Sequence, residues 1–184
     1  MKRFIIGGLP RSGTAWIANF LSMQKNMFCW HEAIQYGEVF ETYGEAIDYP
    51  LFCSPSPEFC GDSTTAILPV FDEVEAQRFF IVRNPNECKD DYIRCLGDAA
   101  RDNWDGIMAN AKTWIDTHKP VRLLFSDIFS RNKETAKRAC NFLVEQITGS
   151  PMSRLSFELL YEKQVQIFGL DETFYDNKTI ITKP

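Results

Sequence analysis

Short apolar runs that end in turn-forming residues occur three times along the chain. The first spans Lys2 to Gly8 and closes on two glycines, the second spans Phe79 to Arg83 and closes on Asn84-Pro85, and the third spans Val121 to Phe125. Runs of this length, bounded by turn signals, are typical of strands that are buried on both faces. The pattern therefore predicts three buried strands.

Between these runs the apolar residues recur every three or four positions, which predicts helices. A helix over 101–118 has one continuous apolar face, made by Trp104, Ile107, Met108, Ala111, Trp114 and Ile115. The same spacing predicts helices over about 14–23, 86–96 and 133–148. Weaker patterns predict a short helix near Ile34 to Tyr43, another around Ser156 to Val165, and an extended segment over Thr179 to Thr182.

Strands that alternate with helices predict a three-layer α/β fold with a mainly parallel central sheet. The sequence shows no internal repeat and no linker-like segment. We therefore expect one domain over residues 1–184.

Composition and charge narrow the classes of function. A net charge of −5 argues against general binding to nucleic acid, which needs a stripe of lysine and arginine. The longest apolar run is far shorter than the roughly 20 residues of a membrane span, so we expect a cytoplasmic protein without a membrane partner.

The six cysteines form no CxxC pair, which disfavours a metal site and favours reduced thiols, including Cys53 and Cys60 on either side of a proline-rich stretch.

The candidate chemistry lies in the turn between the first strand and the first helix, Gly8 to Thr14. Such a turn directs backbone N–H groups and the positive end of a helix dipole toward one point, which suits a phosphate or sulfate. Thr14 stands where a Walker A loop has its lysine, and Ala15 where that loop has its magnesium-binding hydroxyl. The cation is instead Arg11, inside the loop, where its planar guanidinium can bind two oxygens of one anion.

The string GLPRSGTAW at 8–16 resembles the phosphosulfate-binding loop of the sulfotransferase family. The segment FFIVRNPNECKDDY at 79–92 resembles the second nucleotide motif of that family, a buried strand that ends in Arg-Asn-Pro. The likeness extends over about residues 2–152, with weaker matches at Gly61 to Thr64 and Leu123 to Phe129.

This resemblance implies a transferase that moves a sulfuryl group from 3′-phosphoadenosine 5′-phosphosulfate to a hydroxyl or amine of a small molecule or glycan, without a metal. It implies that Arg11 acts on the leaving group and that Arg83 contacts the 3′-phosphate. The alternative for Arg83 is a surface ion pair with a nearby carboxylate. It also implies donor contacts from the first loop and helix, namely from Pro10, Arg11, Ser12, Gly13, Thr14, Ala15 and Trp16. Trp16 would stack near the adenine, or its place on the apolar face of the first helix makes it core.

Two positions depart from the family pattern. Asp91 stands eight residues after Arg83, where many members have a serine that holds the 3′-phosphate, and a carboxylate beside a phosphate is repulsive unless a cation intervenes. Either the helix register shifts so that another residue faces the ligand, or the 3′-phosphate pocket is altered and the donor is not 3′-phosphoadenosine 5′-phosphosulfate. Ala15 replaces a frequent threonine and removes one hydroxyl contact, worth about 1 kcal/mol.

For the catalytic base, the resemblance favours Glu32 over its neighbour His31 in the segment CWHEA, although a histidine titrates nearer neutral pH. The alternative is a surface pair at the start of a helix. Two other functions stay open: a different P-loop activity, such as a small nucleotide kinase, and a non-catalytic nucleotide-binding module. No pattern in the chain specifies the acceptor or an oligomeric state.

Overall fold

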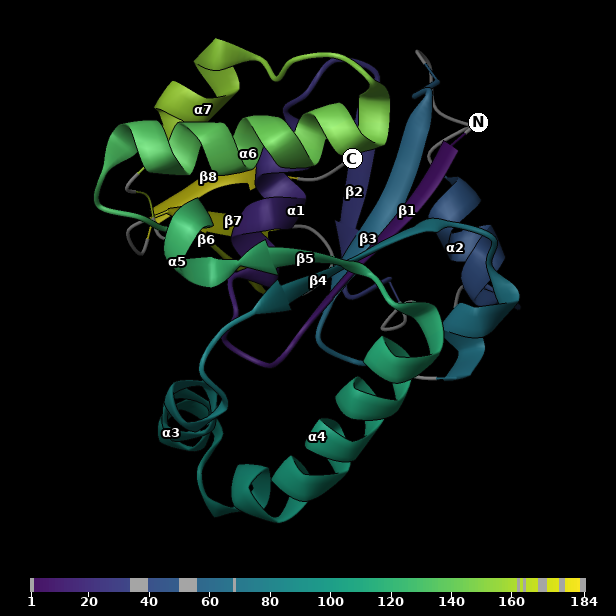
Figure 1. The fold of residues 1–184 in the computed structure, drawn as a ribbon, viewed down its shortest axis with the longest axis vertical. Helices are drawn as coiled ribbons and strands as arrows, with labels where there is room; N and C mark the ends of the chain where they lie inside the picture. The colour runs from purple at the N-terminus through teal and green to yellow at the C-terminus, as the bar shows by residue number, and fades with distance from the viewer. Residues whose placement is uncertain are drawn as a thin grey trace.

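The central feature of the molecule is a five-stranded, all-parallel sheet (Figure 1). The computed structural model describes residues 2–33, 40–49, 56–67, 69–161, 163, 165–168, 172–175 and 178–182. In spatial order the strands are β2 (Met27–His31), β3 (Phe59–Thr64), β1 (Lys2–Gly8), β4 (Gln77–Val82) and β5 (Val121–Leu124). The first strand therefore lies in the middle, where the strand order reverses direction.

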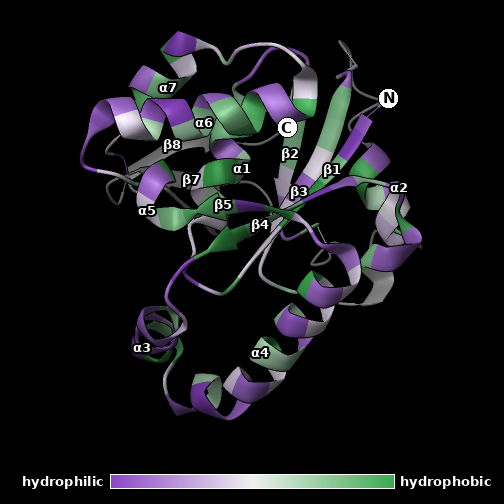
Figure 2. Cartoon of the chain, viewed as in Figure 1, coloured by the Kyte–Doolittle hydropathy of each residue, from purple (hydrophilic) through white to green (hydrophobic). Residues whose placement is uncertain are grey.

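Helices cover both faces of this sheet because its strands are apolar on both faces. Phe4 and Ile6 of β1 pack on one side and Ile5 on the other, in two separate buried clusters. The first face is covered by α1 (Thr14–Ser22), α6 (Lys133–Thr148) and α7 (Arg154–Leu160). The second is covered by α2 (Tyr43–Asp48), the 3₁₀ helix η3 (Pro69–Glu73) and α4 (Asp98–His118). Hydrophobic residues accordingly gather on the strands and on the helix faces turned toward them (Figure 2).

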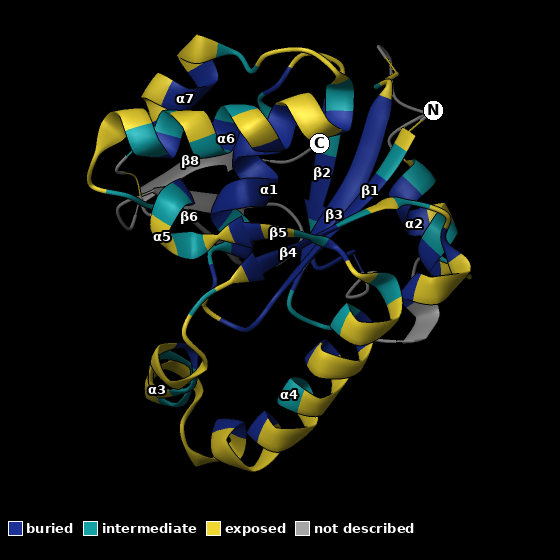
Figure 3. Cartoon of the chain, in the orientation of Figure 1, coloured by how far each residue is buried: buried dark blue, intermediate teal, exposed yellow. Residues whose placement is uncertain are grey.

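The helix α3 (Pro85–Leu96) differs from the other long helices because it is exposed over most of its surface. It packs beside α4 at one end of the molecule, and Cys88 is its one fully buried residue (Figure 3). A single turn, α5 (Phe125–Ile128), follows β5 directly. A second sheet, antiparallel, consists of β6 (Val165–Phe168), β7 (Glu172–Tyr175) and β8 (Lys178–Thr182), with β6 next to α1.

The structure confirms the predicted three-layer α/β class and the three predicted strands, which are β1, β4 and β5. The predicted helices over 14–23, 86–96, 101–118 and 133–148 correspond to α1, α3, α4 and α6, and the expected extended segment lies in β8.

The helix predicted near Ile34 to Tyr43 is wrong over 40–42, because α2 starts at Tyr43 behind a capping box formed by Thr42 and Glu45; residues 34–39 lie outside the described residues. The helix expected around 156–165 ends earlier, at Leu160, and residue 165 already begins β6. In both places a cap or a strand pairing outweighs a weak apolar period.

Two strands of the sheet, β2 and β3, were not predicted from the sequence. The end of β3 reads Gly61-Asp62-Ser63-Thr64, which is polar, yet all six residues of the strand are buried between β1 and β2. The buried carboxylate of Asp62 accepts hydrogen bonds from the Ala33 backbone N–H (3.1 Å) and the Tyr43 hydroxyl (2.9 Å). Tertiary partners thus make a polar strand tolerable in the core.

Candidate functional site

The candidate site lies at the carboxyl edge of the parallel sheet, where the end of every strand supplies part of it. The loop 8–14 follows β1, Glu32 follows β2, Thr65 follows β3, Arg83 follows β4, and α5 follows β5. Ligands of open α/β sheets bind at this edge, next to the strand at which the order reverses. That strand is β1, so the fold places the loop at the expected position.

The loop has an unusual backbone. Arg11 (φ 69°) and Gly13 (φ 85°) are both left-handed, whereas Ser12 between them is not. Alternation of this kind is how proteins build anion-binding nests of N–H groups, although the Ser12 N–H here already donates to the Leu9 carbonyl at 3.0 Å. A left-handed arginine costs of order 1–3 kcal/mol, a strain that is found mainly at functional sites.

Close packing explains why the loop needs its glycines. A side chain on Gly13 would place its Cβ 2.3 Å from the Phe129 ring, and one on Gly8 would lie 2.3 Å from the Ser12 hydroxyl. Ser12 is fully buried, and its hydroxyl has no hydrogen-bond partner among the described residues. A buried hydroxyl beside a helix N-terminus is suited to meet an oxygen of a bound anion.

The side chain of Arg11 is exposed at the mouth of this loop. Within the described part of the chain, none of the ion pairs involves it. The loop therefore offers a cation whose charge is not neutralised by a carboxylate of the described structure.

His31 and Glu32 lie on the wall of the site beside the loop. The His31 ring nitrogen Nε2 is 3.3 Å from the Thr14 hydroxyl, at the first residue of α1, and 3.9 Å from the Glu32 carboxylate. Glu32 is not the exposed helix-start residue of the alternative interpretation, because it is 5% exposed and sits in a left-handed turn (φ 59°). Both residues thus lie on the wall of the site beside the loop 8–14.

The Glu32 carboxylate is held by the end of β3. It accepts hydrogen bonds from the Thr64 hydroxyl, the Thr65 hydroxyl and the Thr65 backbone N–H, all at 2.7 Å, and a longer one from the Ala66 N–H at 3.4 Å. A carboxylate has about four acceptor sites, and all of them are in use here. Glu32 is therefore rigidly placed, and it joins the ends of β2 and β3.

Arg83 lies on the other side of the loop and contacts it directly. One of its terminal nitrogens donates to the Arg11 carbonyl, and the other donates to Asp91 at 2.9 Å. The guanidinium also stacks over the Phe125 ring, 4.4 Å from its centre. The structure thus places Arg83 beside the loop as the sequence predicted, and it places Asp91 on the same guanidinium.

Trp16 is packed in the core, although its edge reaches the site. Its ring stacks on Phe20 with centroids 5.2 Å apart, meets Phe129 edge-on, and its N–H donates to the Leu160 carbonyl at 3.1 Å. At 6% exposure little of its face is left for an adenine. These contacts favour the core interpretation of Trp16.

A cavity of about 600 Å³ brings many of these residues together, but Ser12, Arg83 and Asp91 do not line it. Its wall includes the loop residues Pro10, Arg11, Gly13, Thr14 and Ala15, together with Trp16, His31 and Glu32. This volume is in the range of small-molecule sites.

Several residues of this wall were not singled out from the sequence, namely Thr65, Tyr92, Arg94, Cys95, Leu96, Phe125, Phe129 and Lys163. Phe125 could have been found as the first residue after a parallel strand, and Tyr92 and Arg94 as neighbours of Asp91 on one helix. The remainder reach the site through tertiary packing.

The thiols in the described structure are all free. Burial raises the pKa of Cys60 and of Cys88 to about 11, and that of Cys140 to about 12. Cys95 is exposed and lies on the cavity wall, whereas Cys53 is outside the described residues.

The described residues contain neither a cluster of three metal-ligating side chains nor a helix with the length and apolarity needed to cross a bilayer.

The fold resembles that of a solved structure, the sulfotransferase domain of the olefin synthase from Synechococcus PCC 7002. The likeness covers 89% of this chain and 78% of that domain, with a TM-score of 0.58 and 13% sequence identity. No protein-family model matches the chain, and no curated protein matches it. The chain therefore has a sulfotransferase-like three-layer α/β fold.

Proposed function

We propose that the protein transfers a sulfuryl group from a nucleoside 5′-phosphosulfate to a hydroxyl or amine of a small molecule or glycan. The observation that carries this proposal is the loop at 8–14: an exposed, unneutralised Arg11 above a nest of backbone N–H groups, with neither a Walker lysine nor a hydroxyl at Ala15. Such a loop can bind the oxygens of a phosphosulfate without magnesium. The sulfotransferase-like fold supports the same function.

In this proposal the loop stabilises the leaving group, and the wall beside the loop supplies the base. The acceptor oxygen or nitrogen forms a bond to sulfur while the bond from sulfur to the bridging phosphate oxygen breaks, and the nucleotide leaves with that electron pair. The loop N–H groups and Arg11 would stabilise the charge that develops on the leaving phosphate. A base must take the proton of the acceptor.

His31 and Glu32 supply that base in this proposal. Glu32 is the group that the sequence favours, but its acceptor sites are already used by Thr64 and Thr65, so it must release one of these bonds before it can accept a proton. His31 lies beside it on the cavity wall, and an imidazole titrates nearer neutral pH, so His31 is the better base. Glu32 would then act as the positioning residue that holds its neighbour against Thr14.

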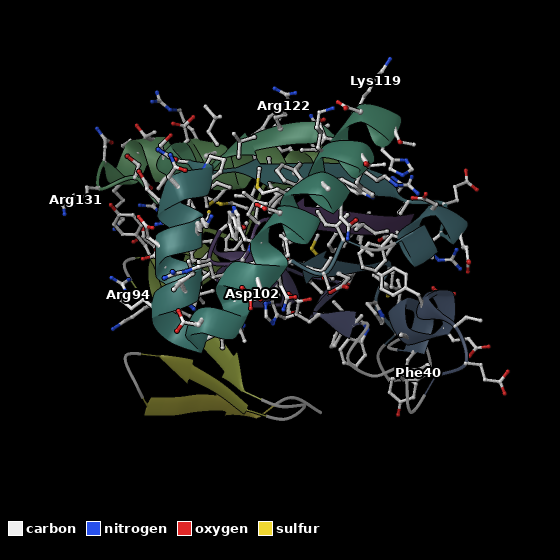
Figure 4. The ribbon with its side chains drawn as sticks, turned by 90° about the horizontal axis from the view of Figure 1, so that it is seen from below. Phe40, Arg94, Asp102, Lys119, Arg122 and Arg131 are labelled. Atoms are coloured by element: carbon white, nitrogen blue, oxygen red, sulfur yellow. The ribbon has the colours of Figure 1, made fainter. Side chains whose placement is uncertain are left out.

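Binding of nucleotides by titration calorimetry tests the proposal. The wild type should bind adenosine 5′-monophosphate without magnesium, and Arg11→Ala should weaken that binding about 100-fold, because two charge-assisted hydrogen bonds are lost. Arg122→Ala is the matched control, since Arg122 is an exposed arginine of β5 that is not part of the cavity wall (Figure 4).

Binding of ATP with magnesium, and not of the monophosphate, would instead support a nucleotide kinase. Nucleotide binding without transfer to any acceptor would support a binding module.

A further inference from the structure

The two arginines at the carboxyl edge of the sheet differ in their counter-charges. Arg83 has an oxygen close to each of its three guanidinium nitrogens: the Glu87 carboxylate at 3.5 Å from Nε, the Arg11 carbonyl, and the Asp91 carboxylate at 2.9 Å. Its side chain is 16% exposed, and Phe125 covers one face. Two of the three nitrogens therefore donate hydrogen bonds within the protein and two carboxylates balance the charge of Arg83, while its Nε is buried without a hydrogen-bond partner among the described residues.

Asp91 also holds a second arginine. Its other oxygen lies 2.5 Å from Arg94, which projects from α3 on the side away from α4 and forms part of the cavity wall (Figure 4). Arg83, just before α3, thus forms one network with Glu87, Asp91 and Arg94, which lie on successive turns of that helix. Their formal charges sum to zero.

A second phosphate on the nucleotide would meet this network at a cost. A phosphate monoester carries about −1.5 to −2 charges at neutral pH. To bind Arg83 it would have to compete with Asp91 and Glu87. At Arg94, which is 76% exposed and pairs with Asp91 through one nitrogen, it would lie close to the Asp91 carboxylate and be repelled by it. A ribose hydroxyl is neutral and can donate a hydrogen bond to a carboxylate, so it meets no such repulsion.

We infer that the donor carries its phosphate charge on the 5′ side alone, and that the substrate class is a nucleoside 5′-phosphosulfate with a free 3′-hydroxyl. Asp91 is the specificity-determining residue, because it occupies the two guanidinium groups that a 3′-phosphate would need. This inference rests on the proposed function and specifies which nucleoside 5′-phosphosulfate is the donor. It departs from the donor that the sequence resemblance implies, 3′-phosphoadenosine 5′-phosphosulfate.

Calorimetry with two probes, adenosine 5′-monophosphate and adenosine 3′,5′-bisphosphate, tests the inference. The wild type should bind the monophosphate at least about tenfold more tightly than the bisphosphate. Asp91→Ser removes the carboxylate that Arg83 and Arg94 share and should raise bisphosphate affinity at least about tenfold, with monophosphate affinity changed less than about threefold. Asp90→Ser is the control, because Asp90 is an exposed carboxylate on the same helix that makes none of the ion pairs of α3.

The outcomes separate the inference from the proposed function. If the wild type prefers the bisphosphate, or if Asp91→Ser leaves the preference unchanged, the inference is wrong and the proposed function stands. If neither nucleotide binds to any form, the proposed function fails and the inference fails with it. Thermal denaturation checks that Asp91→Ser is folded, and Asp91→Asn, which keeps the shape but removes the charge, replaces it if it is not.

Discussion

The loop after β1 places Arg11 on the cavity wall, and the end of β4 places Arg83 against that loop just before α3, but the two arginines differ in their counter-charges. The loop is tightly packed under Phe129 and keeps Arg11 away from carboxylates. The helix α3 is mostly exposed and surrounds Arg83 with two of its own carboxylates, one and two turns along. An arginine at a ligand-binding edge is thus an anion site only where the protein leaves its charge unneutralised.

The rigidity of the two regions differs for the same physical reason. The loop joins two elements that are almost completely buried, so a small change in it is resisted by the core. On α3, Cys88 is the single fully buried residue, and ion pairs hold much of the rest in place. Four predictions test how far this contrast extends, from the largest expected effect to the smallest.

Gly13→Ala should have the largest effect, because it breaks the loop itself. A left-handed alanine costs about 1–2 kcal/mol, and the clash with Phe129 adds a similar amount, so we expect a loss of about 2–4 kcal/mol in the free energy of unfolding and no measurable nucleotide binding. Urea denaturation measures the first and calorimetry the second. Gly149→Ala is the matched control: its φ is +74°, but nothing lies within 4 Å of the added Cβ, so only the backbone cost remains. Equal losses for the two variants would show that packing against Phe129 contributes nothing.

Exchange of each arginine for glutamine tests the contrast directly. Arg11→Gln should weaken binding of adenosine 5′-monophosphate about 100-fold with little change in stability, because its charge serves the ligand. Arg83→Gln should change that affinity by less than about fivefold but lower the stability by about 1–2 kcal/mol, because Glu87 and Asp91 lose a partly buried partner. The contrast is disproved if Arg83→Gln weakens monophosphate binding as strongly as Arg11→Gln does.

Glu32→Gln and His31→Asn separate positioning from proton transfer on the wall beside the loop. In Glu32→Gln the new amide cannot accept the bonds from Thr64 and Thr65 on both sides, so we expect a stability loss of about 1–3 kcal/mol together with lost turnover. His31→Asn should remove turnover and leave stability within about 0.5 kcal/mol. Denaturation and sulfuryl-transfer assays measure the two effects. Full turnover in His31→Asn would show that His31 is not the base and would favour Glu32 instead.

Alkylation of the thiols gives the smallest effect and tests the α3 side of the cavity. A pH of 8 is far below the raised pKa values of the buried Cys60, Cys88 and Cys140, so these side chains stay protonated and unreactive in the folded protein. Cys95 is exposed and should react. Adenosine 5′-monophosphate at ten times its Kd should slow labelling of Cys95 by up to about tenfold, since Cys95 forms part of the cavity wall. Peptide mapping by mass spectrometry identifies each site. An unchanged rate at Cys95 would place the nucleotide away from α3.

Much of the fold was predictable because its central strands and long helices carry strong local patterns. The apolar runs of β1, β4 and β5 and the single apolar face of α4 are local signals, and each was found in the sequence. β3 was not found, because its polar residues are stabilised by partners that are distant in the sequence, such as Tyr43 on Asp62. The antiparallel pairing of β6 with β7 was missed for a different reason: its partners are close in the sequence, but each strand has only 4 residues, too few to carry a clear pattern.

The features of the candidate site also fall into two groups, those that local sequence predicts and those that depend on tertiary contacts. From the sequence alone one could predict the strand, turn and helix around Arg11, the missing Walker lysine, and the place of Arg83 at the end of a buried strand, because these depend on residues that are close together in the chain. Only the tertiary structure decided that Glu32 is saturated by the end of β3, and that Arg83 is neutralised by Asp91 while Arg11 is not. A local pattern fixes which residue types lie at the edge of the sheet, but the charge that each one offers to a ligand depends on which groups the fold brings within a few ångströms of it.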